Sequence, residues 1–220
     1  MNGQSPTAMD TFENWIIAPD DPGAEARSKM LEAKVLKVFD GDGFLAEIPR
    51  PSDKSQIKEV SLRLAFIDAP EKDQLHGAEA RAFLERLIGG KTLWLELIGK
   101  ESAGYAPIDP YKRVLCMAYL TEEMSTGDVE YFHNGKCDVG EVRRARSVTR
   151  NVELELIVNG WAWVTHQYTF EHEDEYFAAQ DIARSARRGL WAMNNPEPPW
   201  RFKQRQKARR KIESQQSSLF

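Results

Sequence analysis

Five short apolar runs constrain the fold of this 220-residue chain more than any other feature. Several alternate apolar with polar residues, and β-branched, aromatic and leucine side chains dominate them. A period of two is typical of strands that bury one face. Turn residues separate the runs, which are LEAKVLKVF, FLAEI, VSLRLAFI, TLWLEL and RVLCMAYL. The pattern therefore predicts a small antiparallel barrel or a sandwich.

Helical patterns interrupt these strands. Residues 76–91 and 171–188 each place apolar side chains at the i, i+3, i+4 spacing of an amphipathic helix. Residues 151–160, NVELELIVNG, are ambiguous. Their apolar positions alternate as in a strand, but Asn151 is a good N-cap and Gly160 a good helix stop.

Composition divides the chain into parts. Residues 1–28 are polar and turn-rich, which predicts a loosely held arm. Residues 29–196 hold the strands and helices of the predicted domain. Within it, residues 121–150 are polar and hairpin-like, which predicts a surface insertion. No apolar run approaches the roughly 18–20 residues that span a bilayer.

Residues 197–220 form a basic C-terminal tail, although the net charge of the chain is −4. Seven basic side chains lie between Arg201 and Lys211 without an acid among them. Such a tail favours contact with phosphate backbones, but a solvated helix end or a disordered tail fits equally well.

The N-terminus and the cysteines indicate where the protein is located and whether it binds zinc. The N-terminus lacks a secretory signal pattern, so a cytoplasmic protein is expected, provided the numbering starts at the native N-terminus. Cys116 lies in an apolar run and is interpreted as a buried side chain. His133 and Cys137 stand four apart, but no second pair of ligands accompanies them, so no structural zinc site is expected.

The turn after the first run carries two carboxylates, Asp40 and Asp42, each followed by glycine. A tight turn that brings carboxylates together suits a hard cation such as Ca²⁺ or Mg²⁺. By itself, this composition is more often that of a hairpin turn without further function.

Two further segments carry charges at strand ends. RLAFIDAPE delivers Arg63, Asp68 and Glu71 within nine residues, and Arg113 opens a later strand after the turn Pro-Tyr-Lys. Each segment alone is compatible with ordinary surface ion pairs. Phosphodiester hydrolysis needs a base, cations for the phosphorane and a metal for the phosphate. Together the segments supply a residue type for each role.

The motifs also resemble those of the staphylococcal nuclease (thermonuclease) family. VFDGDG, RLAFIDAPE, DPYKR, GWAWV and RRGLW occur in family order over residues from about 30 to 195. The resemblance implies an α+β, mainly β fold: a five-stranded OB-fold barrel with three helices, in which residues 151–160 are helical. It also implies a phosphodiester hydrolase, an endonuclease that acts on DNA, RNA or both.

The resemblance assigns metal-binding residues. Asp42 and Asp68 are expected to bind the metal together with the backbone carbonyl of Ala69. Asp40 is expected to stand close by and act through a bound water. The expected ion is Ca²⁺, with Mg²⁺ as an alternative.

The resemblance also assigns catalytic residues. Glu71 is expected to be the general base on the attacking water. Arg63 and Arg113 are expected to grip the scissile phosphate, because their planar forks match its oxygens.

Three positions depart from the family pattern. Gly43 stands where threonine is common, so a hydroxyl near the metal is lost. Lys112 replaces the usual glycine before Arg113 and adds a cation near the phosphate path. His166 and Tyr168 occupy the positions of two tyrosines on which bases stack, with packing at the barrel rim as the alternative.

The main rival hypothesis is a non-catalytic nucleic-acid-binding OB-fold module or scaffold. A degenerate copy would have lost an arginine, the glutamate or an aspartate, and here all six charged positions are present. The sequence therefore favours an active nuclease.

Overall fold

The computed structural model describes residues 16–17, 30–50, 53–98, 108–124, 127–133, 136–142, 146–165 and 169–217. Its main sheet has six strands, which are β2 (Leu31–Val38), β3 (Gly43–Arg50), β4 (Asp53–Leu64), β6 (Thr92–Leu97), β7 (Val114–Met124) and β10 (Arg146–Asn151).

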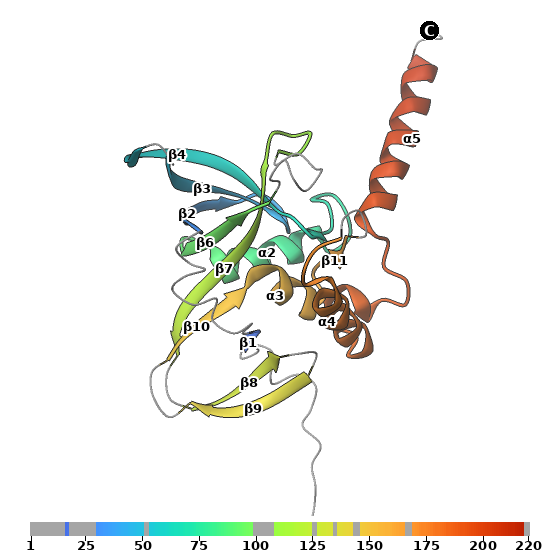
Figure 1. Cartoon of the computed structure of the whole chain (residues 1–220). Coiled ribbons are helices and arrows are strands. Elements are labelled where there is room, and N and C mark those ends of the chain that lie inside the picture. Colours follow the sequence, from blue (N-terminus) through green and yellow to red (C-terminus); the bar gives the residue numbers. More distant parts are fainter. Residues whose placement is uncertain are drawn as a thin grey trace, which may run out of the picture.

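This sheet closes on itself (Figure 1). The strand order is β10-β7-β4-β3-β2-β6, and β6 also pairs with β7. Five strands therefore form a closed barrel, with β10 as an extension beside β7. The β4–β7 pairing is parallel and the other pairings are antiparallel, so the sequence-based expectation of a wholly antiparallel barrel is wrong at this seam. The predicted α+β, mainly β fold with an OB-type barrel is confirmed.

The strand β2 illustrates how the alternating pattern builds the core. Ala33, Val35 and Val38 are buried, whereas Leu36 is exposed. The register with β3 shifts between Val35 and Lys37, which marks a β-bulge. A bulge adds one residue to a strand and changes which face the following side chains occupy. Val38 therefore reaches the core, and the chain enters the Asp40 turn directly after it.

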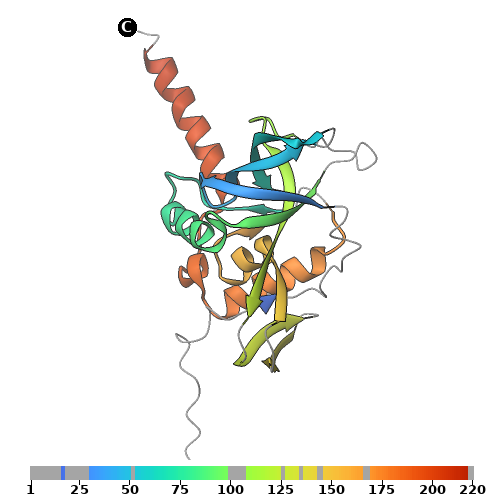
Figure 2. The same cartoon turned by 90° about the vertical axis from the view of Figure 1, so that its left-hand side faces the viewer.

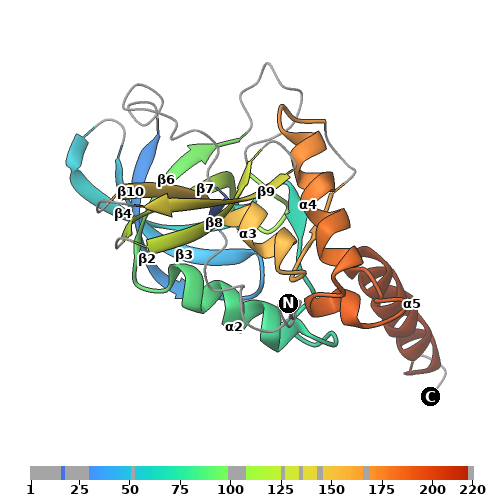
Figure 3. The ribbon, with the colours of Figure 1, turned by 90° about the horizontal axis from the view of Figure 1, so that it is seen from below.

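The three expected helices are present: α2 (Gly77–Ile88), α3 (Val152–Val158) and α4 (Glu173–Ser185). Figure 3 shows α3 between the barrel and α4. The side chain of Asn151 accepts a hydrogen bond from Leu154 N, as expected of an N-cap. The alternation in this segment is misleading because Glu153 and Glu155 are buried along with the apolar residues.

The predicted insertion contains an antiparallel hairpin of β8 (Gly127–His133) and β9 (Lys136–Val142). Part of the N-terminal arm joins it, since β1 (Ile16–Ile17) pairs in parallel with β8. This hairpin lies at the opposite end of the molecule from the C-terminal helix (Figure 1).

The basic tail forms a fourth helix, α5 (Pro199–Ser217), which projects away from the domain (Figure 2). A disordered tail is therefore ruled out for these residues. Phe202 is buried at the start of α5, where Trp200 packs against a cluster that contains Trp163 and Trp191. These tryptophans are packing residues between the barrel, α4 and α5. Within the described part of the chain, no helix combines the length and apolar character needed to cross a bilayer.

Candidate active site

The turn between β2 and β3 lies against the loop that follows β5 (Ile67–Asp68). A Cβ atom added at Gly41 would stand 2.6 Å from the Cβ of Ala69, so only glycine allows this approach. A hydrogen bond also ties the two segments, since Ala69 N donates to Asp42 Oδ2 at 3.4 Å, and Leu64 N at the end of β4 donates to Asp42 O at 2.9 Å. The close approach brings the predicted metal-binding aspartates to one place.

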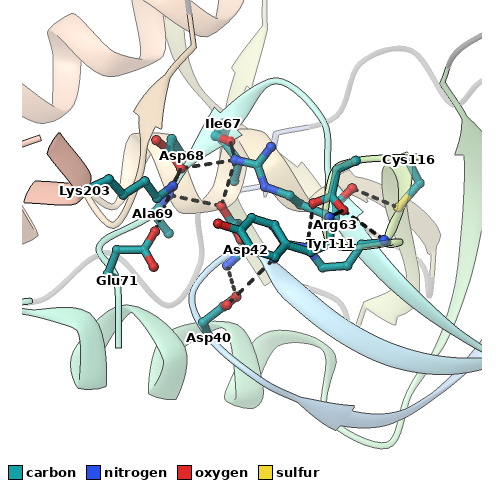
Figure 4. Close-up of polar contacts among 12 residues, drawn as sticks. Asp40, Asp42, Arg63, Ile67, Asp68, Ala69, Glu71, Tyr111, Cys116 and Lys203 are labelled. Carbon is teal, nitrogen blue, oxygen red and sulfur yellow. Dashed lines mark hydrogen bonds and ion pairs between the residues drawn. The ribbon is translucent and has the colours of Figure 1, made fainter. Parts of the chain in front are cut away.

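Arg63 lies between these aspartates (Figure 4). Its Nη2 is 3.3 Å from Asp42 Oδ2 and 3.1 Å from Asp68 Oδ1. Burial alone would lower the pKa of Arg63, but the charges of Asp42, Asp68 and Asp109 outweigh it and raise that pKa. Arg63 is thus a permanent cation with its guanidinium fixed by two carboxylates.

Arg113, at the start of β7, is held by a residue that the sequence reasoning missed. Its Nε donates to Asp109 Oδ2 at 2.8 Å, and its backbone N donates to Asp109 Oδ1 at 2.9 Å. Burial would raise the pKa of Asp109, but the hydrogen bonds from Arg113 outweigh it and lower the pKa. Asp109 was visible only as the first letter of the motif DPYKR.

The free end of Arg113 points towards the aspartate turn. Its Nη1 is 3.7 Å from Asp42 Oδ1 and 3.9 Å from Asp40 Oδ2. A Cβ at Gly43 would stand 2.8 Å from Asp40 Oδ1 and 3.2 Å from Arg113 Nη1. The departure from threonine to Gly43 therefore makes room for this contact between Asp40 and Arg113.

Lys112 is exposed and has a φ of 64°, in the left-handed region. This conformation costs a non-glycine residue roughly 1–2 kcal/mol, which explains why glycine would suit the position. The structure thus places the Lys112 side chain on the surface beside Arg113.

Two aspartates here have a raised pKa. Burial, followed by the nearby charge of Asp42, raises the pKa of Asp40 to about 6. Burial and the charge of Asp42 also raise the pKa of Asp68, although Lys203 and Arg63 act in the opposite direction. A nearby cation stabilises the ionised form of such crowded carboxylates.

Glu71 contacts a residue that the sequence reasoning placed outside the site. Lys203, in the first turns of α5, has its Nζ 2.8 Å from Glu71 Oε1 and 3.2 Å from Asp68 Oδ1 (Figure 4). The only sequence signal for Lys203 was its membership of the basic tail.

The oxygen ligands present suit a hard cation, but they do not form a complete cage. Asp42 and Asp68 face each other across one nitrogen of Arg63, and Ala69 adjoins both. Among the described residues, no three acidic, histidine or cysteine side chains cluster closely enough to hold a metal. Two carboxylates and a carbonyl, completed by water, match the preferences of Ca²⁺ and Mg²⁺. The donor set therefore fits a partly hydrated ion.

Most of these residues line one open cleft of about 390 Å³, and Arg63 and Asp68 adjoin it through their contacts with Asp42 and Lys203. Its lining combines acids, cations and aromatic rings, namely Phe39, Asp40, Asp42, Ser61, Ala69, Pro70, Glu71, Tyr111, Arg113 and Lys203. The predicted base-stacking residues His166 and Tyr168 lie outside the described residues.

A closed OB-type barrel with this site at one end defines a protein of the phosphodiester-hydrolase class. Residues 61–193 match the model of the staphylococcal nuclease homologue family, and the chain belongs to this family.

Relatives agree with this placement. An uncharacterized endonuclease of Haemophilus influenzae is 29% identical over 174 residues, covering 79% of this chain and 74% of its own. An uncharacterized endonuclease of Escherichia coli is 28% identical over 175 residues, covering 80% and 86%. A micrococcal nuclease of Shigella flexneri is 24% identical over 174 residues, covering 79% and 81%.

Proposed function

We propose that this protein is a metal-dependent nuclease that hydrolyses phosphodiester bonds in DNA, RNA or both. One observation carries the proposal: three separate segments bring two arginines, two aspartates and a glutamate together, and Asp42, Glu71 and Arg113 among them line one cleft. Family membership and the names of the relatives support the coarser conclusion that the chain is a nuclease.

Asp42, Asp68 and the backbone carbonyl of Ala69 would hold the cation, with Asp40 acting through a bound water. Ca²⁺ is the first candidate and Mg²⁺ the second. When bound, such an ion neutralises charge on the phosphate and polarises it towards attack. The raised pKa values of Asp40 and Asp68 are consistent with a site that favours a cation.

Glu71 is the proposed general base. Its side chain is 39% exposed, so water reaches the carboxylate from the open side of the cleft. A carboxylate in this position accepts the proton of the attacking water as the new P–O bond forms. The P–O bond to the leaving oxygen breaks, that oxygen takes up a proton from solvent, and Glu71 returns its own proton to solvent.

Arg63 and Arg113 are proposed to stabilise the charge that develops on the phosphorane. Each guanidinium is fixed by carboxylates, Arg63 by Asp42 and Asp68, and Arg113 by Asp109. A donor held in place before the reaction stabilises the transition state without reorganising.

The test is incubation of the purified protein with labelled DNA and RNA in the presence of Ca²⁺, Mg²⁺ or EDTA. Cleavage that requires the cation is expected. Binding of nucleic acid without cleavage under any cation would contradict the proposal and favour the non-catalytic module instead.

A further inference from the structure

The helix α5 leaves the domain after its first two turns. Phe202 anchors it, but every described side chain from residue 207 to 215 is exposed. A polar helix that packs on nothing gains no stability from an apolar face. Its projecting part is therefore available to a partner.

Most basic side chains of α5 lie on two opposite faces, with Lys211 between them. Lys203, Lys207 and Arg210 follow the i, i+4, i+7 spacing and share one face, here called the α5 ridge. Arg205 and Arg209 lie on the opposite face, where they pair with acids that neutralise them: Arg205 with Glu197 at 2.6 Å and Arg209 with Glu213 at 2.8 Å. In the described part of the chain, Lys207 and Arg210 form no ion pair.

The α5 ridge continues the catalytic cleft. Lys203, Lys207 and Arg210 line a second open cleft of about 270 Å³, whose lining also contains Lys72 and one further acid, Asp73. This cleft shares Glu71, Tyr111 and Lys203 with the catalytic cleft. A row of cations thus begins at the proposed general base and runs outwards along the helix.

We propose that the α5 ridge binds consecutive phosphates of the nucleic acid on one side of the scissile bond. The inference rests on the proposed nuclease function and adds a binding surface outside the family-matched residues. At 1.5 Å per residue, Lys203 to Arg210 spans about 10 Å, the length of about three nucleotides of a duplex strand. The enzyme therefore prefers substrates that extend several nucleotides beyond the scissile bond on the side of the α5 ridge.

The first test is equilibrium binding of a labelled 20-nucleotide DNA to the full chain in EDTA over a range of salt. The ridge variant is Lys207→Gln/Arg210→Gln, and the matched control is Arg205→Gln/Arg209→Gln, which removes the same charge from the other face. Each lost phosphate contact lowers the slope of log K against log salt by about 0.7–0.9. We expect a slope flatter by about 1.4–1.8 and binding weaker by about tenfold or more at 0.1 M salt for the ridge variant, with the control like wild type. Equal effects of the two pairs, or none, would overturn the proposal.

The second test separates this inference from the proposed function. The ratio of kcat/KM for the 20-nucleotide substrate to that for a dinucleotide should fall in the ridge variant and not in the control. Circular dichroism checks that α5 keeps its helix in both. A protein that binds DNA through the α5 ridge but cleaves nothing would refute the proposed nuclease function and leave the ridge proposal standing. If the protein cleaves DNA but the kcat/KM ratios of the ridge variant and the control are the same, the ridge proposal is refuted and the nuclease function stands.

Discussion

The Nζ atom of Lys203 lies 2.8 Å from Oε1 of Glu71 and therefore joins the C-terminal helix to the candidate active-site cleft. Lys203 stands outside the stretch that matches the family model, residues 61–193. It also contacts Asp68, so a protein cation competes for a carboxylate that is proposed to bind the metal.

Replacing Lys203 should therefore strengthen metal binding. In Lys203→Met, Asp68 loses the ammonium and a like charge near the ion is removed. Half-exposed ion pairs are worth up to about 1 kcal/mol, so Ca²⁺ or Mg²⁺ should bind about two- to fivefold more tightly. Calorimetry without nucleic acid measures this. Arg205→Met, which removes a charge that pairs with Glu197, is the control. Weaker metal binding in Lys203→Met would contradict the competition.

Glu71→Gln keeps the shape of the side chain but cannot accept a proton from water. We expect kcat to fall by about 10²–10⁴, with the Kd for DNA close to that of wild type. Single-turnover kinetics and a binding assay measure the two separately. Near-normal activity combined with a lower melting temperature would make Glu71 a structural residue.

Asp109 is a positioning residue for Arg113, so their substitutions should not be additive. Asp109→Asn removes the charge that holds Nε, and Arg113→Lys removes the fork itself. Each should lower kcat by about tenfold or more, and Asp109→Asn should have little further effect in the Arg113→Lys background. Full additivity of the two effects on kcat in this double-mutant cycle would show that Asp109 does not act through Arg113.

Asp42 should be essential for the metal. Asp42→Ala removes a proposed ligand and leaves Arg63 with one carboxylate, so cleavage should be lost and metal binding weakened. Asp181→Ala, on the exposed face of α4, serves as the control. Undiminished cleavage by the wild-type protein in excess EDTA would remove the metal from the mechanism.

Glu153 makes stability depend on pH. Burial raises the pKa of this carboxyl from 4.5 to about 8. The folded state then binds the proton more tightly, so this contribution to stability is complete below pH 4.5 and is lost as pH rises to about 8. Glu153→Gln keeps an acceptor for Ala118 N but does not titrate. Its free energy of unfolding, relative to wild type, should rise by about 2 kcal/mol between pH 6 and 8.

Denaturant unfolding at several pH values measures this difference. The exposed Glu171→Gln serves as a control and should follow the wild-type curve. A difference between Glu153→Gln and wild type that stays constant across pH would show that Glu153 is already ionised in the folded protein.

The sequence by itself determined the barrel strands and the core of the site. Alternation and turn composition are local signals, and RLAFIDAPE carries Arg63, Asp68 and Glu71 within one contiguous segment. Local pattern failed at residues 152–158 because Glu153 and Glu155 are buried, so polarity no longer marked the exposed face.

Only the tertiary structure decided that Lys203 lines the cleft and that Asp109 holds Arg113 there. Asp109 acts through the geometry of one turn, and Lys203 acts through the docking of α5 by Phe202. The basic tail has no apolar stripe, so its sequence did not decide between a solvated helix end and a disordered tail. Contacts between distant segments depend on how whole elements pack, and no local periodicity encodes that packing.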